Sequence, residues 1–168
     1  MNKIYLSIYV NLLFSTFSIV AVDTITNQVG SAGASCIGNS VIISDIHPNV
    51  GAIHTQSYYI QSNQNYASDL IEIGLSPDEI IDYLINNDVQ NNPSIRQYGA
   101  VDLFQEFNYG FLLEEECSEI EGSQWSGNPG SGELGECVDS TVSRSASFTG
   151  DNCSDWKGHI NGINYAIQ

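Results

Sequence analysis

No lysine or arginine occurs between Arg96 and Arg144, and this stretch interrupts an otherwise regularly patterned chain of 168 residues. Nine carboxylates lie between Glu106 and Asp139, among Gly, Ser and Pro residues. Such a composition is typical of solvated loops, and like charges this close repel one another. The stretch therefore predicts an acidic, loop-rich insertion over about residues 104–144, extended and mobile, within one domain.

The acidic balance extends to the whole chain. Four Lys and Arg residues stand against twenty Asp and Glu, so the formal net charge is -16 and the pI is near 4.1. A field of this sign repels phosphate backbones, which argues against nucleic acid and anionic membranes as partners. Hydrophobic residues make up 42% of the chain and aromatics 10%, which indicates a folded protein with one core.

The N-terminal stretch predicts a signal peptide over residues 1–15. Lys3 is the only charged residue before Asp23, and it precedes the apolar run 4–14 and the small residue Ser15. Cleavage there would make the protein secreted or periplasmic, with no membrane contact afterwards. An uncleaved anchor is the alternative, because apolar residues continue to Val22, but interspersed Ser, Asn and Thr residues make a poor spanning helix.

Export is consistent with an even number of cysteines, at positions 36, 117, 137 and 153. Four cysteines allow three pairings. We expect Cys117 to pair with Cys137, because both lie in the insertion and close a loop of about 20 residues, worth roughly 3 kcal/mol in the chain-entropy model. Cys36 and Cys153 would then be buried near each other or free.

Outside the insertion the chain alternates strand and helix signals. Ser76-Pro77-Asp78-Glu79 combines an N-cap, an N1 proline and a capping-box glutamate, which predicts a helix start. The runs 16–22 and 28–35 flank a turn at 23–27 and predict a β-hairpin. Further predictions are a helix over 65–73, a turn over 45–49, strands over 50–59, 95–103, 142–149 and 163–168, and an irregular stretch before the last strand.

Several motifs match familiar spacings without their required context. The glycines of 130–135 have dinucleotide-fingerprint spacing but follow no predicted strand, and Ser154 and Lys157 lack a secure helical turn to join them. The three histidines lack zinc spacing, and the acidic cluster lacks EF-hand spacing, so a solvated loop is favoured over a Ca²⁺ site. We predict no cofactor and no metal.

Thr16 has a further property if the chain is cut after Ser15. The new N-terminus would carry a hydroxyl and a free α-amine on one residue, a nucleophile with its own base. An α-amine has a pKa of about 7.7–8, so part of it is neutral at pH 7. The alternative is an ordinary strand threonine preceded by extra residues. The small residues 30–35 leave room for another backbone or a ligand beside that strand.

Several blocks resemble one family in the right order. They are Thr16-Phe17-Ser18-Ile19-Val20-Ala21, Asp23, Gly30-Ser31-Ala32-Gly33-Ala34-Ser35, Gly51-Ala52-Ile53-His54-Thr55-Gln56, Gly74-Leu75-Ser76-Pro77, Arg96-Gln97-Tyr98-Gly99 and Phe148-Thr149-Gly150. Over 16–103 and 145–168 the chain resembles the domain-of-unknown-function family 1028, with the acidic stretch as an insertion. The family is similar in fold to N-terminal nucleophile hydrolases, which implies an α+β four-layer αββα sandwich. Members continue beyond the residue matching Gln168, so we expect the sandwich to be incomplete at the C-terminus.

Together with the predicted signal peptide, the resemblance leads to the hypothesis of an exported amidohydrolase-like domain over 16–168, with Thr16 as the nucleophile and an unknown amide as substrate. Ser35, Thr55 and Gln56 are the predicted orienting and oxyanion residues, because their polar tips lie beside the small-residue strand. A non-catalytic exported binding or accessory module with the same fold is the alternative, since fold alone does not establish function. A small-molecule or peptide-like ligand fits either reading, and the oligomeric state stays open.

Overall fold

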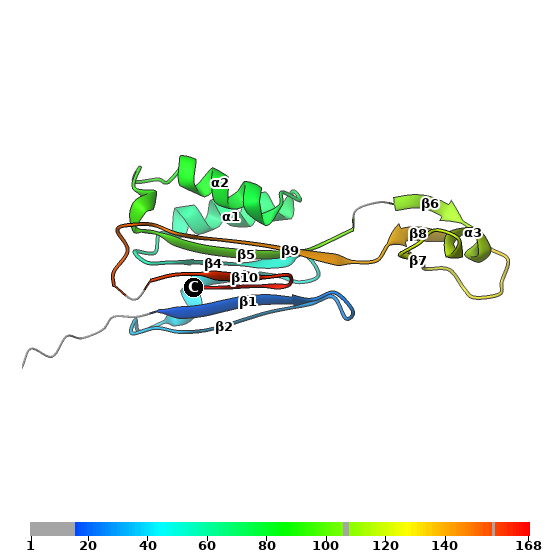
Figure 1. Cartoon of the computed structure of the whole chain (residues 1–168), viewed down its shortest axis with the longest axis horizontal. Helices are drawn as coiled ribbons and strands as arrows, with labels where there is room; N and C mark the ends of the chain where they lie inside the picture. The colour runs from blue at the N-terminus through cyan, green and yellow to red at the C-terminus, as the bar shows by residue number, and fades with distance from the viewer. Residues whose placement is uncertain (1–15, 106–107, 156) are drawn as a thin grey trace, which may run out of the picture.

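The computed structural model describes residues 16–105, 108–155 and 157–168. The protein is a mixed α/β structure in which all strand pairs are antiparallel. Two four-stranded sheets lie face to face, and two helices cover the outer side of one of them (Figure 1). We call this part, residues 16–105 and 140–168 as described, the body. Residues 108–139 project from one end as a separate arm (Figure 1).

The first sheet has the order β10-β11-β1-β2. The predicted hairpin is confirmed as β1 (Phe17–Asp23) and β2 (Gln28–Ala34), joined by a turn in which Asp23 accepts hydrogen bonds from Ile25 N and Thr26 Oγ1. The last strand is β11 (Tyr165–Ile167). The stretch predicted to be irregular contains β10 (Ile160–Gly162), because pairing with β11 supplies hydrogen bonds that the local sequence does not signal.

The second sheet has the order β3-β4-β5-β9. Its strands are β3 (Ser44–His47), β4 (Gly51–Gln56), β5 (Gln97–Phe104) and β9 (Val142–Thr149). Strand β3 occupies part of the predicted 45–49 turn, so that turn is shorter than expected and centres on Asn49, at φ 62°. Short 3₁₀ helices, η1 (Ser40–Ile43) and η2 (Pro93–Ile95), precede β3 and β5.

Two helices, α1 (Gln61–Glu72) and α2 (Pro77–Asn86), form the third layer. The predicted capping box is confirmed: Ser76 Oγ accepts from Glu79 N, and the Glu79 carboxylate accepts from Ser76 N at 2.8 Å. Apolar side chains from both helices pack against the second sheet in one buried cluster, which includes Ile53, Ile71, Ile80, Leu84 and Tyr98. No helix in the described ranges is long and apolar enough to cross a membrane.

The space between the two sheets changes character along the strands. At the end nearer the arm it is apolar, with Val20, Val22, Ala52, Val101 and Ala166 buried together. Toward the start of β1 it becomes polar and holds buried serine, glutamine and histidine side chains. Burial of polar groups is unfavourable unless they are hydrogen-bonded, so this half of the layer is organised by specific contacts instead of by the hydrophobic effect.

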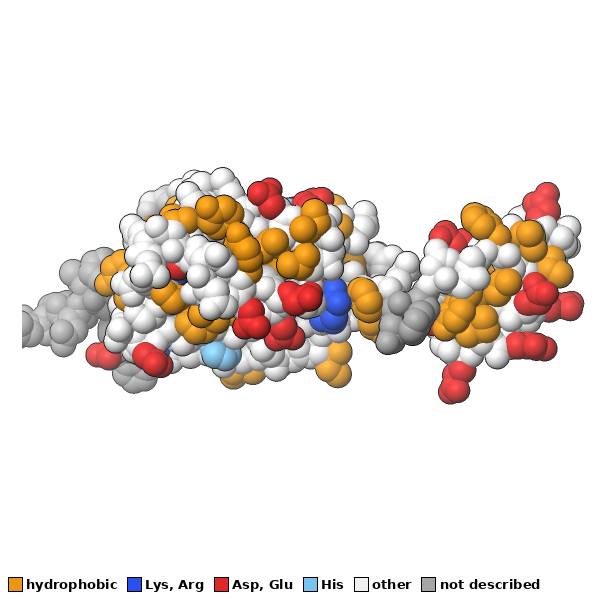
Figure 2. All heavy atoms as spheres, turned by 90° about the horizontal axis from the view of Figure 1, so that it is seen from above, with side chains coloured by type: hydrophobic (Ala, Val, Ile, Leu, Met, Phe, Trp, Pro, Cys, Tyr) orange, Lys and Arg blue, Asp and Glu red, His pale blue; other side chains and the backbone are white. Residues whose placement is uncertain are grey.

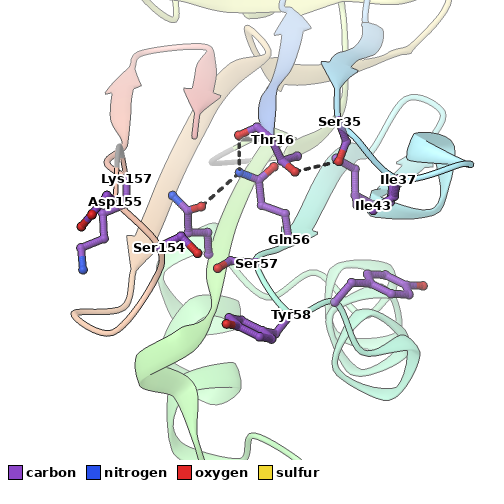
Figure 3. A pocket seen from close by; sticks show the side chains of 12 residues that line it. Thr16, Ser35, Ile37, Ile43, Gln56, Ser57, Tyr58, Ser154, Asp155 and Lys157 are labelled. Carbon is purple, nitrogen blue, oxygen red and sulfur yellow. Dashed lines mark hydrogen bonds between the residues drawn. The ribbon is translucent and has the colours of Figure 1, made fainter. Parts of the chain in front are cut away.

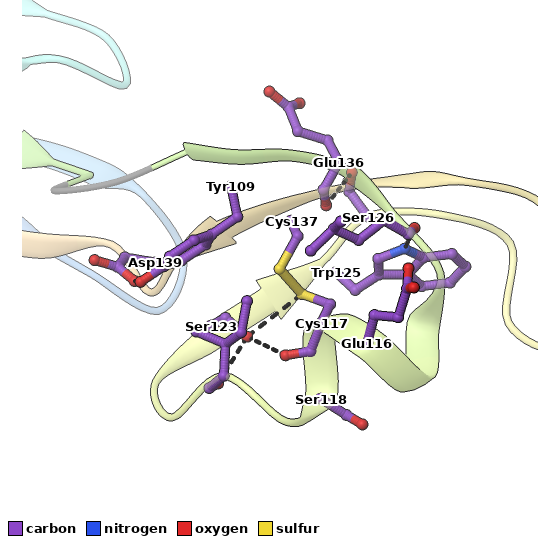
Figure 4. Close-up of a disulfide and its surroundings, with 12 residues drawn as sticks. Tyr109, Glu116, Cys117, Ser118, Ser123, Trp125, Ser126, Glu136, Cys137 and Asp139 are labelled. Carbon is purple, nitrogen blue, oxygen red and sulfur yellow. Dashed lines mark hydrogen bonds between the residues drawn. A yellow bond between two sulfur atoms is a disulfide. The ribbon is translucent and has the colours of Figure 1, made fainter.

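The arm contradicts the prediction of an extended, loop-rich insertion. It contains β6 (Asn108–Leu112), α3 (Glu114–Ser118), β7 (Ser123–Trp125) and β8 (Gly135–Asp139), with the three strands in the order β6-β8-β7. The predicted disulfide is present, joining Cys117 of α3 to Cys137 of β8 with their Cα atoms 5.7 Å apart (Figure 4). Cys36 and Cys153 remain thiols, the first exposed and the second buried.

Two contacts explain why so acidic a segment folds. The disulfide ties α3 to the central strand, and Trp125 lies against Gly127 and Gly135 while its indole N–H donates to the carbonyl of Leu112 at 2.9 Å. A Cβ on Gly127 would lie 2.0 Å from the indole ring, so only glycine permits this packing. Seven of the arm's eight described carboxylates are exposed around this small core, where water and salt screen their repulsion.

Candidate functional site

A pocket of about 380 Å³ opens where β1 begins and β4 ends, at the polar end of the body. Its walls come from strand ends and from the loops that follow β2, β4 and β9, so segments distant in sequence meet there (Figure 3). The lining combines neutral polar, aliphatic and aromatic side chains with two charged ones. The lining residues are Thr16, Ser35, Ile37, Ile43, Gln56, Ser57, Tyr58, Tyr59, Gln97, Ser154, Asp155 and Lys157.

Thr16 lies immediately before β1, and its hydroxyl points into the pocket (Figure 3). Its Oγ1 atom is 2.8 Å from the Oγ of Ser35, which follows β2 on the neighbouring strand. The backbone carbonyl of Thr16 accepts a 3.3 Å hydrogen bond from Gln56 Nε2. Three of the four predicted site residues thus lie in direct contact, supplied by two strands of one sheet and one strand of the other.

A chain of neutral side chains continues inward from Thr16. Gln56 and Gln97 lie opposite each other on β4 and β5, and Gln56 Nε2 donates to Gln97 Oε1 at 3.3 Å. Ser18 Oγ bridges the amides of Gln56 and Gln168, at 2.8 and 2.9 Å from their Oε1 atoms. This polar chain fixes the Gln56 side chain from both ends, and no charged group takes part in these hydrogen bonds.

Gly99 shows how closely the polar chain is packed. A Cβ on Gly99 of β5 would lie 1.8 Å from Nε2 of Gln168, so a side chain there would displace the amide. Gln168 Nε2 instead donates to the carbonyl of Tyr98 and to Ser147 Oγ, both at 3.3 Å. The glycine therefore makes room for a buried amide between the sheets.

Ser57 and Tyr58, which line one edge of the pocket, have an unusual backbone conformation; we call them the pocket's lip. Ser57 and Tyr58, directly after β4, both have positive φ angles, 59° and 58°, which L side chains adopt only at some energetic cost. The guanidinium of Arg96 donates to the carbonyl of Tyr58. Arg96 is itself buried and paired with Asp88, with Nε donating to Oδ2 at 2.8 Å. The lip is thus held by an ion pair from the body's interior.

The surroundings of Asp88 keep it ionised. Burial alone would raise the pKa of this carboxyl, but hydrogen bonds from Arg96, from the backbone N–H of Asn92 and from Asn63 outweigh it. The pKa of Asp88 therefore lies well below its usual range. Because the carboxylate is fully charged at neutral pH, it stabilises the Arg96 guanidinium beneath the lip.

His54 lies on β4 two residues before Gln56, on the same face of the strand, and it is almost fully buried. Burial disfavours the imidazolium and lowers the pKa of His54 to about 4, so the ring is neutral at pH 7. Its Nδ1 atom has no hydrogen-bond partner among the described residues. His54 is therefore a buried neutral group whose protonation would be costly.

Thr55 does not belong to this pocket. It follows His54 on β4, and its side chain points to the opposite face of the sheet, where Oγ1 donates to Gln64 Oε1 of α1 at 2.8 Å. Alternation along a strand accounts for this, because neighbours in sequence face opposite sides. The same alternation shows from the sequence that Thr55 and Gln56 cannot both face the pocket, but the neighbouring sheet decides which of them does.

Three residues of the polar chain were missed from the sequence: Ser18, Gln97 and Gln168. Ser18 and Gln97 are polar residues at inward-facing positions of β1 and β5, and Gln168 directly follows β11, so no local pattern marks the three as members of one chain of hydrogen bonds. Ser154 and Lys157 both line the pocket, but the Lys157 ammonium donates to the carbonyls of Asp151 and Cys153. Figure 3 shows Lys157 on the side of the pocket away from Thr16.

Comparison with known proteins identifies the class of this domain. A family model described as a family of unknown function, DUF1028, matches residues 16–123, and the chain belongs to this family. No curated protein matches it. The fold is similar to the crystal structure of protein SPO2555 from Silicibacter pomeroyi, with 19% sequence identity and a TM-score of 0.58. The similarity covers 90% of this chain but 50% of the other, so the chain spans about half the length of that structure.

Proposed function

We propose that the domain is an exported hydrolase of a small amide, with Thr16 as its N-terminal nucleophile. The observation that carries the proposal is the position of Thr16 in the pocket: its hydroxyl lies 2.8 Å from Ser35 Oγ, and its backbone carbonyl accepts a hydrogen bond from Gln56, which is paired with Gln97. Its hydrogen-bonded neighbours Ser35, Gln56 and Gln97 are neutral donors and acceptors, which suit the recognition of an uncharged amide group.

The chemistry requires a base, and the described side chains around Thr16 do not supply one. The hydrogen bond of Oγ1 goes to a serine, while His54 lies outside the pocket lining, two residues before Gln56, and its lowered pKa of about 4 makes it a weak base. Removal of residues 1–15 would place a free α-amine on Thr16 itself. The amine would take the hydroxyl proton as Oγ1 attacks the amide carbonyl, and would pass it to the departing amine as the C–N bond breaks. Water would then hydrolyse the acyl ester and restore the hydroxyl.

The layer arrangement supports a relationship to N-terminal nucleophile hydrolases. The described residues of the body form three layers (Figure 1). Helices α1 and α2 cover the β3-β4-β5-β9 sheet, and the other face of that sheet packs against the β10-β11-β1-β2 sheet. The outer face of the β10-β11-β1-β2 sheet carries apolar residues such as Phe17, which is 61% exposed. A second helical layer over this face would complete the αββα sandwich. Export through the predicted signal peptide would place the Cys117–Cys137 disulfide in an oxidising compartment, where disulfides persist.

The decisive experiment compares two forms of the protein that differ only at the N-terminus. One begins at Thr16 and the other retains residues 1–15, with intact mass confirming each. We expect only the first to hydrolyse members of an amide library, Thr16→Ser to retain activity and Thr16→Ala to lose it. Thr26→Ala, in the exposed β1–β2 turn, is the matched control and should leave the rate unchanged. Hydrolysis by both N-terminal forms would exclude the α-amine as base.

The alternative is a binding module that uses the same pocket without chemistry. The hydrogen bond between the Thr16 and Ser35 hydroxyls favours it, because a neutral hydroxyl partner does not activate a nucleophile. In that case ligands would bind saturably to both N-terminal forms, as measured by calorimetry, and no amide would be cleaved. Binding of the same ligands would be weakened by Gln56→Ala and unchanged by Thr26→Ala.

A further inference from the structure

The arm carries an apolar surface that its own small core does not use. Phe111 and Leu134 are 70% and 60% exposed, and Leu113 is also exposed. Leu112 pairs with Gly135, so the residues that follow and precede them, Leu113 and Leu134, lie at the same end of the ladder. We call Phe111, Leu113 and Leu134 the arm patch.

The other side of the arm sheet is already occupied. Cys137 points from β8 to Cys117 of α3, and Trp125 packs on the same side against Gly135 (Figure 4). Phe111 pairs with Glu136, which neighbours Cys137 and therefore faces away from the disulfide. The arm patch thus lies on the free face of a two-sided sheet. Exposed apolar patches with a polar rim mark interaction surfaces in soluble proteins.

The charges around the patch define its partner. The arm's described residues carry eight carboxylates and no lysine or arginine, and seven of the eight are exposed. They are Glu114, Glu115, Glu116, Glu119, Glu121, Glu133, Glu136 and Asp139. Figure 2 shows apolar side chains on the arm bordered by these acidic groups. A second copy of this chain would bring the same charge to the contact and be repelled, whereas a cationic surface would be attracted.

We propose that the arm docks a partner protein that presents lysine or arginine residues around an apolar side chain. The apolar side chain would cover Phe111 and Leu134, and the basic residues would face Glu133 and Glu136, which flank Leu134 in sequence. The arm's projection beyond the body leaves this surface open to a macromolecule (Figure 1). The interaction is independent of the pocket, which lies at the opposite end of the body.

Peptide probes test this surface directly. Fluorescence anisotropy would measure the affinity of a short lysine-rich peptide carrying phenylalanines, and of a second peptide in which serines replace them. We expect the first peptide to bind more tightly and Phe111→Ser to weaken it about tenfold. The double variant Glu133→Gln, Glu136→Gln should weaken both peptides by roughly fivefold, with the effect shrinking at high salt. Both changes are at exposed positions, and circular dichroism would confirm the fold.

The matched control removes the same charge from the body. Asp69 and Asp82 are exposed carboxylates on α1 and α2, and the double variant Asp69→Asn, Asp82→Asn should leave the affinity within a factor of two. Three outcomes overturn the proposal: equal weakening by the control, equal affinity for the two peptides, or an unchanged affinity in Phe111→Ser. Self-association of the wild-type chain through the patch, detected by analytical ultracentrifugation and abolished by Phe111→Ser, would assign the surface to a second copy instead.

Discussion

The body and the arm reach a folded state by different physical means. The body buries two apolar clusters, one between the helices and a sheet and one between the sheets, and its charged interior groups are paired. The arm has no comparable cluster within its described residues, and relies on one disulfide and one tryptophan. Small segments that cannot bury enough apolar surface commonly depend on such covalent closure. The comparison shows that a strongly acidic segment need not be disordered when a disulfide compensates for its small apolar core.

The largest expected effect concerns the body's interior. Asp88→Asn removes the carboxylate that accepts from Arg96 and leaves that guanidinium buried without its partner. Breaking a buried ion pair on one side costs about 3–5 kcal/mol, and urea unfolding should show a loss of that order. Asp82→Asn, an exposed change of the same kind on α2, is the control and should change the free energy of unfolding by less than about 0.5 kcal/mol. Similar values for the two variants would contradict the role assigned to the pair.

Removal of the disulfide tests whether the arm and the body unfold independently. Replacing Cys117 and Cys137 by serine should destabilise the arm by about 3 kcal/mol. The body should stay folded, because the loop that the disulfide closes, with a sequence separation of 20 residues, lies wholly within the arm. Hydrogen exchange resolved by peptide would show faster exchange over β6, β7 and β8 only. The matched control is Cys153→Ser, which changes a buried thiol of the body and leaves the arm's exchange unaffected. Loss of body protection in the disulfide variant would show that the arm is not an independent unit.

A smaller effect, confined to the body, follows from His54. Its pKa falls from 6.5 in the unfolded chain to about 4 when buried, so the unfolded state binds more protons between these pH values. Stability therefore rises with pH through this window, and falls by about 2 kcal/mol from this group as pH drops from 7 to 5. His54→Leu should remove that component of the pH dependence measured by urea unfolding. Asn65→Leu, an exposed change on α1 that removes no titratable group, should leave the slope unchanged.

Local sequence patterns predicted the elements whose signals are themselves local. The Ser76–Glu79 capping box and the turn at Asp23 are satisfied by hydrogen bonds between residues two or three positions apart, so they could be recognised without tertiary information. The Cys117–Cys137 pairing was predictable for a similar reason, since both cysteines lie in one segment. The family resemblance rested on sequence blocks in the right order, and the family model that matches residues 16–123 confirms it.

The candidate site could be predicted only in part. Thr16, Ser35 and Gln56 were selected from the sequence and meet in the pocket, whereas Thr55 faces α1. The register of β4 decides this, and a shift of one residue would exchange Thr55 and Gln56 between the faces. The strand alternation was present in the sequence, but the face directed toward the pocket was not evident without the neighbouring sheet.

The rest of the site depends on contacts between distant segments. Ser18 and Gln168 lie 150 positions apart yet share a hydrogen bond between the sheets, and Gly99 matters only because the Gln168 amide lies against it. The arm's structure depends likewise on Trp125 meeting Leu112 and the two glycines. A short polar or acidic sequence carries the same local signal whether it is solvated or buried. Long-range strand pairing supplies the hydrogen-bond partners and packing neighbours that decide between those two states.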